Sequence, residues 1–155
     1  MIIIFQCFGG THTSVTAASI YLGKLPRSRI PRLEELLDLP HFDRVENADI
    51  GTLNYLGRDR RGNRVFALGS GRWSAAIREL LPPLLQLYGP EVPALALIDC
   101  SSAVTWPVRL GGFLSRSLHC IDPGRPLVGW GILRNYRRLL QLAEHFEADP
   151  ARYLL

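Results

Sequence analysis

Short apolar stretches alternate along the chain with stretches in which apolar residues recur at helical spacing. The stretch 2–7 (IIIFQC) is β-branched and aromatic with almost no polarity, which predicts a strand covered on both faces. The stretch 93–102 has the same character up to Asp99, and 124–132 (GRPLVGWGI) predicts a short third core strand. Continuous apolar runs of this kind are typical of parallel sheets.

Segments with helical spacing lie between these strands. Thr11, Thr13 and Ser14 offer N-cap oxygens to a first helix, which we expect to continue to Pro26. The stretch 52–69 predicts a β-hairpin with its turn near 59–63. Further helices are predicted at 31–39, 73–81, 108–118 and 134–148. Pro82-Pro83 should end or kink the helix at 73–81, and an apolar run follows up to Gly89. In the last helix, positions 136, 139, 140, 143 and 146 are expected to face inward.

The alternation of strands and helices predicts a three-layer α/β fold. We expect a mostly parallel sheet with helices on both faces, one antiparallel β-hairpin, and a first βα turn that is P-loop-like. The length of 155 residues, without a linker or repeat, favours a single domain over 1–155.

Composition narrows the class of protein. Hydrophobic residues make up 47% of the chain and charged residues 21%, as in ordinary globular proteins. The net charge of +4 comes almost wholly from arginine, which suits an anionic ligand. A compositional bias of the source genome explains the same excess of arginine and is the favoured interpretation. Cys7, Cys100 and Cys120 show no disulfide pattern, and no apolar run reaches the length of a membrane span, so a cytoplasmic protein is expected.

The stretch CFGGTHTS (7–14) has the composition of an anion-binding loop. The N-terminus of a helix presents free N–H groups and the positive end of its dipole, and Gly9 and Gly10 let the backbone approach a ligand closely. The predicted ligand-binding residues are therefore Gly9, Gly10, Thr11, Thr13 and Ser14, with Arg72 or Arg116 as a clamp from elsewhere in the chain.

Three side chains could carry chemistry at this loop. Cys7 precedes a helix N-terminus, which favours a nucleophilic thiolate, although buried cysteines are more often structural. His12 is a candidate acid/base or phosphate donor, or it hydrogen-bonds the turn. Asp99 is a candidate orienting group or proton acceptor, or it caps a loop. No cofactor is expected, Mg²⁺ is left open at Asp99, and Cys7 with Cys100 is a candidate redox pair.

The spacing from Cys7 to Thr13-Ser14 resembles the phosphocysteine loop of the cellobiose- and lactose-type IIB components of the sugar phosphotransferase system. It is also similar to the C-x5-R-[ST] loop of low-molecular-weight tyrosine phosphatases, but Thr13 stands where those enzymes have arginine. Both resemblances imply that Cys7 attacks phosphorus while loop N–H groups hold the phosphoryl oxygens. GGTHTS also differs from a P-loop NTPase, because the required lysine is missing.

A resemblance over most of the chain is to a family of small, functionally uncharacterised bacterial proteins, mostly from spore-forming lineages. Its members begin with a strand, a cysteine, an aromatic residue and GGTHSS, which matches 7–14 here. Further matches are LGKLP (22–26), GGFLSR (111–116) and GRPLVGWG (124–131). The resemblance implies a shared fold but no activity.

Two hypotheses follow from the sequence. In the first, the protein binds a phosphorylated small molecule or nucleotide and transfers or hydrolyses the phosphoryl group through Cys7. In the second, the same loop binds such a ligand without chemistry, and the protein acts through a protein partner. A nucleic-acid partner is not expected, because the arginines at 134, 137 and 138 come without any known recognition motif.

Overall fold

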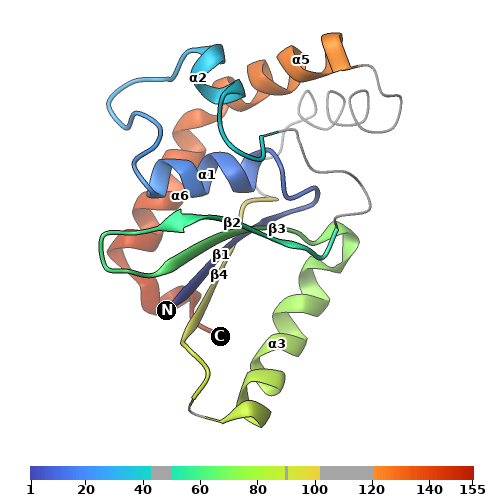
Figure 1. The fold of residues 1–155 in the computed structure, drawn as a ribbon, viewed down its shortest axis with the longest axis vertical. Helices are drawn as coiled ribbons and strands as arrows, with labels where there is room; N and C mark the ends of the chain where they lie inside the picture. The colour runs from blue at the N-terminus through green and yellow to red at the C-terminus, as the bar shows by residue number, and fades with distance from the viewer. Residues whose placement is uncertain (43–49, 90, 102–120) are drawn as a thin grey trace.

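The centre of the fold is a four-stranded sheet with the strand order β2-β3-β1-β4. The computed structural model describes residues 1–42, 50–89, 91–101 and 121–155. β1 pairs in parallel with both β3 and β4, and β2 joins β3 as an antiparallel hairpin, as predicted (Figure 1). The strands are β1 (Ile2–Cys7), β2 (Leu53–Arg58), β3 (Arg64–Gly69) and β4 (Leu95–Asp99).

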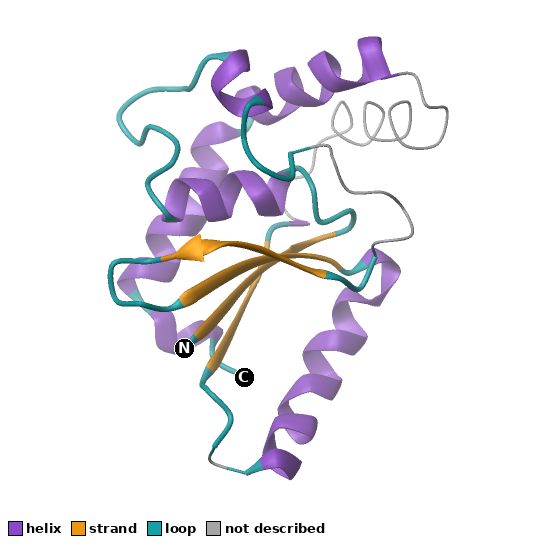
Figure 2. Cartoon of the chain, in the orientation of Figure 1, coloured by secondary structure: helices purple, strands orange, loops and turns teal. Residues whose placement is uncertain are grey.

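Helices cover both faces of this sheet, which confirms the predicted α/β class. α1 and α6 lie on one face and α3 lies on the other (Figure 2). α2 and α5 pack together beyond α1 (Figure 1). The helices are α1 (Thr13–Tyr21), α2 (Leu33–Leu37), α3 (Ser74–Tyr88), α5 (Ile121–Arg134) and α6 (Tyr136–Ala148), with short 3-10 turns at Gly71–Trp73 and Pro150–Tyr153.

The larger part of the core lies between the sheet and α1 and α6. β1 is central and buried almost along its whole length, which explains why its sequence is apolar at nearly every position. α1 is buried over most of its surface, so it also carries small and apolar residues all round. A smaller cluster on the opposite face joins the sheet to α3 and contains Ile4, Leu68, Leu95 and Leu97 with Ile77, Leu81 and Leu85.

The predicted third core strand at 124–132 is wrong, because these residues belong to helix α5. Val128 and Ile132 are buried, whereas Trp130 between them is 62% exposed. That four-residue spacing is helical, and in a strand all three side chains would share one face. The helix is favoured by tertiary packing: a Cβ at Gly129 would lie 2.3 Å from Leu33 Cδ1, so the glycine lets α5 approach α2 closely.

Two helix boundaries also differ from expectation. α1 ends at Tyr21 rather than near Pro26, because Gly23 adopts a φ of +72°. The N–H of Gly23 donates to the carbonyl of Ile20, and the N–H of Lys24 donates to the carbonyl of Ser19. α3 does not end at Pro82-Pro83 but continues to Tyr88. None of its residues is buried, so the carbonyls that the prolines leave without a partner can bond to water.

Of the remaining predicted helices, one is shorter than expected, one cannot be compared with the structure, and one is confirmed. The helix predicted at 31–39 is shorter, and the one predicted at 108–118 lies outside the described residues. The last helix is confirmed, with its predicted inward positions Tyr136, Leu139, Ala143 and Phe146 buried and Leu140 half-buried. The C-terminus returns to the sheet, where the N–H of Leu155 donates to the carbonyl of Leu95.

Candidate functional site

The loop between β1 and α1 places Cys7 beside the first turn of the helix. Cys7 is the last residue of β1, and its side chain belongs to the core cluster on the α1 face. The N–H of Gly10 donates to Cys7 Sγ over 3.2 Å, and Ser14 Oγ lies 3.2 Å from the same sulfur. The sulfur of Cys7 therefore has two polar neighbours, both from the loop and the first turn of α1.

The two glycine-rich loops of the chain pack directly against each other. Gly10 has a φ of +73°, and a Cβ there would lie only 2.4 Å from the backbone nitrogen of Gly69. The N–H and hydroxyl of Ser70 both donate to the carbonyl of Cys7, and the N–H of Gly71 donates to that of Phe8. Backbone contact between the ends of β1 and β3 therefore requires glycine at 10, whether or not a ligand binds.

The hydroxyl groups of the loop are buried. Thr11 and Thr13 are at most 1% exposed, and their Oγ1 atoms are buried oxygens without a hydrogen-bond partner among the described residues. Buried polar groups in folded proteins nearly always have partners, so two on one loop are unusual. This is the feature of the loop that the fold itself does not explain.

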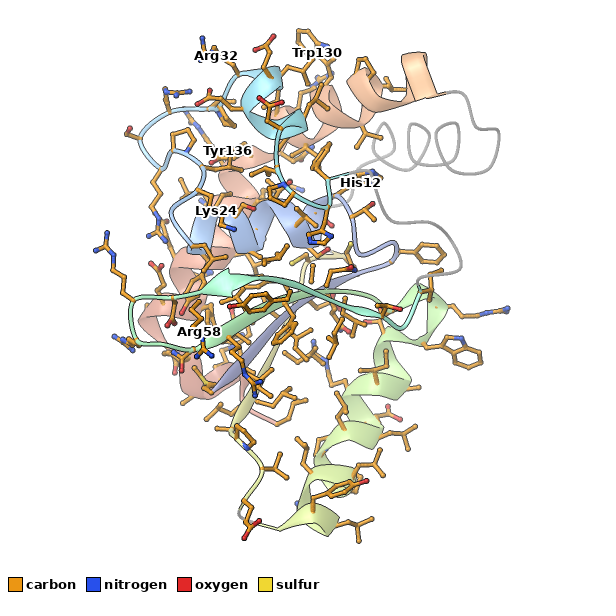
Figure 3. The ribbon with its side chains drawn as sticks, viewed as in Figure 1. His12, Lys24, Arg32, Arg58, Trp130 and Tyr136 are labelled. Atoms are coloured by element: carbon orange, nitrogen blue, oxygen red, sulfur yellow. The ribbon has the colours of Figure 1, made fainter. Side chains whose placement is uncertain are left out.

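His12 occupies the N-cap position of α1, where Thr11, Thr13 or Ser14 was expected (Figure 3). Thr13 and Ser14 instead lie in the first turn of the helix. The carbonyl of His12 accepts from the N–H and from the hydroxyl of Thr16, at 2.9 and 2.8 Å. Its ring is 7% exposed and packs edge-on against Phe42, with ring centroids 5.5 Å apart.

Asp99 lies on the opposite face of the sheet from Cys7. It stands opposite Gln6 in the β1–β4 register, and successive side chains of a strand alternate between faces. Its carboxylate accepts from the hydroxyl of Ser74 at 3.3 Å and from the N–H of Ser101 at 2.8 Å. The structure therefore brings Cys7, Gly10 and Ser14 together but not Asp99.

Sequence reasoning missed Gln6 and Ser74. Gln6 Nε2 donates to Ser74 Oγ over 2.9 Å, and the fully buried Oε1 of Gln6 has no hydrogen-bond partner in the part of the chain that the structure describes. A glutamine within an otherwise apolar strand was the available signal. Its partner could not be found, because α3 begins 68 positions along the chain from Gln6.

The other predicted residues are less closely involved. The exposed guanidinium of Arg72 stacks on Trp73, 5.6 Å from the ring centroid. Arg72 immediately follows Gly69–Gly71, the loop that contacts residues 7–10. Arg116 and Cys120 lie outside the described residues. Cys7 and Cys100 are free, and burial raises the pKa of the Cys100 thiol, with the charges of Cys7 and Asp99 acting in the same direction. Within the described ranges, no group of three or more His, Cys, Asp or Glu could hold a metal ion.

Comparison with known proteins identifies the family but no activity. Residues 2–147 match DUF3189, a family described as proteins of unknown function. No curated protein and no solved structure matches the chain. In the part of the chain that the structure describes, no helix is both long and apolar enough to cross a bilayer. Because the match spans nearly the whole chain, including the loop at 7–14, this protein belongs to the DUF3189 family of proteins of unknown function.

Proposed function

We propose that the loop 7–14 binds a phosphate-bearing small molecule or nucleotide. The observation that supports this is the pair of buried hydroxyls of Thr11 and Thr13 at the N-terminus of α1, which have no hydrogen-bond partner within the described ranges. Each unsatisfied buried hydroxyl costs about 1–3 kcal/mol. Phosphate oxygens would accept hydrogen bonds from both hydroxyls and from the free N–H groups of the first helical turn, and the helix dipole favours the same charge.

We further propose that Cys7 is the nucleophile of a phosphoryl transfer. Its thiolate would attack phosphorus, forming an S–P bond while the bond from phosphorus to the leaving oxygen breaks. His12, at the helix start, would supply the proton to that oxygen. Water or an acceptor hydroxyl would then attack the phosphocysteine, breaking the S–P bond and returning the thiolate. The hydrogen bond from Gly10 to Cys7 Sγ supports this role.

The alternative is a binding module without chemistry, which would act through a protein partner. It is favoured by the burial of Cys7, which is only 3% exposed, and by the position of Asp99 on the other face of the sheet. Under this alternative Cys7 would be a structural residue whose sulfur accepts the Gly10 N–H.

Phosphate binding can be tested with valine substitutions, because valine keeps the shape of threonine and removes the hydroxyl. Inorganic phosphate should raise the unfolding temperature of the wild-type protein, as any ligand specific for the folded state does. The double variant Thr11→Val, Thr13→Val should lose this response and be at least as stable as wild type without phosphate. Thr16→Val is the matched control: its hydroxyl is also buried but already bonds the carbonyl of His12. An equal phosphate response in all three proteins, or none in wild type, would contradict the proposal.

Cys7→Ser separates the two candidate functions. A binding module should keep its response to phosphate in this variant. A phosphocysteine enzyme should keep binding but lose all formation of a covalent phosphoprotein from acetyl phosphate, detected by the mass of the intact chain. Cys100→Ser is the control, since Cys100 is also free and buried.

A further inference from the structure

Three polar side chains meet on the α3 face of the sheet, where β1 and β4 end and α3 begins. Gln6 and Asp99 stand opposite each other in the register of the two strands, and Ser74 is the first residue of α3. Gln6 Nε2 lies 2.9 Å from Ser74 Oγ, which lies 3.3 Å from Oδ2 of Asp99. These three side chains, which we call the Asp99 cluster, form one hydrogen-bonded chain on the opposite face of the sheet from Cys7.

The charge on Asp99 sets the direction of the hydrogen bonds in this cluster. An ionised carboxylate only accepts, so the hydroxyl proton of Ser74 goes to Asp99. Ser74 Oγ must then accept from the amide nitrogen of Gln6, which leaves Gln6 Oε1 as an open acceptor. The Gln6 side chain is fully buried, and its Oε1 has no hydrogen-bond partner among the described residues. The cluster therefore presents a buried amide oxygen next to the remaining lone pairs of a carboxylate.

Asp99 forms no ion pair with any of the described residues. Its hydrogen-bond donors there are the hydroxyl of Ser74 and the N–H of Ser101, and both are uncharged. The ion pairs of the described ranges involve other carboxylates, those of Glu35 and Glu147. The positive end of α3 supplies only roughly half an elementary charge, so part of the carboxylate charge is left without compensation. A bound water molecule would satisfy the buried amide oxygen but would supply no positive charge, whereas a cation would do both.

We propose that the Asp99 cluster binds a Mg²⁺ ion through the oxygens of Gln6, Ser74 and Asp99. Carboxylate, amide and hydroxyl oxygens are the ligands that hard cations of this class prefer. So few protein oxygens fit Mg²⁺ better than Ca²⁺, because Mg²⁺ keeps several water ligands whereas Ca²⁺ takes about six to eight oxygens. With a single carboxylate, the cluster differs from the groups of three or more His, Cys, Asp or Glu that the described residues lack. This inference does not depend on phosphate binding at the loop 7–14.

Titration of the full chain with MgCl₂ tests the site. MgCl₂ should raise the unfolding temperature of wild type more than NaCl does at the same ionic strength, because a specific ligand stabilises the folded state. Asp99→Asn keeps the shape of the side chain and removes its charge, so the dissociation constant for Mg²⁺ should rise by roughly a hundredfold. Gln6→Met removes the buried amide oxygen and should raise it by roughly tenfold. Glu79→Gln is the matched control, since Glu79 is an exposed carboxylate on the same helix and should not affect the response.

Mn²⁺ locates the bound ion, because it has the same ligand preference as Mg²⁺ and broadens the NMR signals of nearby nuclei. The backbone amide signals of Ser74 and Ser101 should broaden first, and excess Mg²⁺ should restore them. The double variant Thr11→Val, Thr13→Val should keep both responses, so the Mg²⁺ and phosphate proposals can fail separately. A wild-type response to MgCl₂ no larger than that to NaCl would overturn the proposal. An unchanged response in Asp99→Asn, or broadening that begins at other amides, would overturn it as well.

Discussion

Alanine at Gly10 should destabilise the fold far more than alanine at Gly23, although the two glycines have φ values of +73° and +72°. For an alanine, a left-handed conformation alone costs roughly 1–2 kcal/mol. At Gly23 a Cβ would meet nothing within 4 Å, so this is the whole expected cost. At Gly10 the Cβ would lie 2.4 Å from the nitrogen and 2.8 Å from the Cα of Gly69. Those atoms are backbone, so no side chain can move aside.

The clash at Gly10 should add about 1–3 kcal/mol, the usual cost of overpacking a filled interior. Gly10→Ala is therefore expected to lose about 2–5 kcal/mol, a large share of the ~5–15 kcal/mol that stabilises a typical domain. Urea unfolding followed by circular dichroism gives these free energies, and Gly62→Ala, another open site with a φ of +81°, is a second control. A Gly10→Ala loss within about 0.5 kcal/mol of both controls would show that the loops are not in tight contact and would refute this reasoning.

Two further predictions concern hydrogen bonds outside the loop. Tyr136→Phe removes the hydroxyl that donates to the Pro26 carbonyl at 2.6 Å and should cost about 1 kcal/mol in urea unfolding. Burial raises the pKa of Tyr136 to about 12, so this residue should cost the wild type stability as pH rises from about 10 to 12, where the unfolded tyrosine ionises first. The variant should lose less stability over this range than wild type, and the remainder is expected from Tyr21, whose pKa is also raised by burial. The Arg29 hydrogen bond lowers the pKa of Glu35 to about 2, so its contribution should be complete above pH ~4.5 and disappear as pH falls toward 2. Glu35→Gln should show a urea midpoint that changes less between pH 5 and pH 3 than that of wild type; an equal change would contradict the assignment.

The pattern of apolar residues was sufficient to predict the strands of the sheet, but it was not sufficient to predict helix α5. The run 2–7 and the hairpin turn are local signals, since apolar continuity marks a covered strand and the Asp59–Asn63 turn lies between two alternating stretches. The stretch 124–132 combines glycine, proline and apolar residues, which suits a strand as well as a helix. Its structure depends on the contact between Gly129 and Leu33, residues far apart in the chain.

In the candidate site too, the contact made within one short loop could be predicted from the sequence, and the contact that depends on distant residues could not. Cys7 and Ser14 were expected to meet, and they do, because one strand end and one helix start are joined by a short loop. The placement of Asp99 could not be predicted, since it depends on strand register. Asp99 pairs with Gln6 rather than Cys7, and a shift of one residue moves a side chain to the other face of a sheet.

The position of β1 in the sheet has a consequence for how the protein folds. β1 is synthesised before both of its partner strands, since Ile2 pairs with Arg64 on one side and with Leu95 on the other. This apolar segment therefore has no strand partner until β3 has also left the ribosome. Contacts so distant in sequence slow folding, and an exposed apolar strand is prone to aggregate meanwhile. We expect the sheet to form only after β3 and β4 have been synthesised, and β1 to be a binding site for chaperones of nascent chains until then.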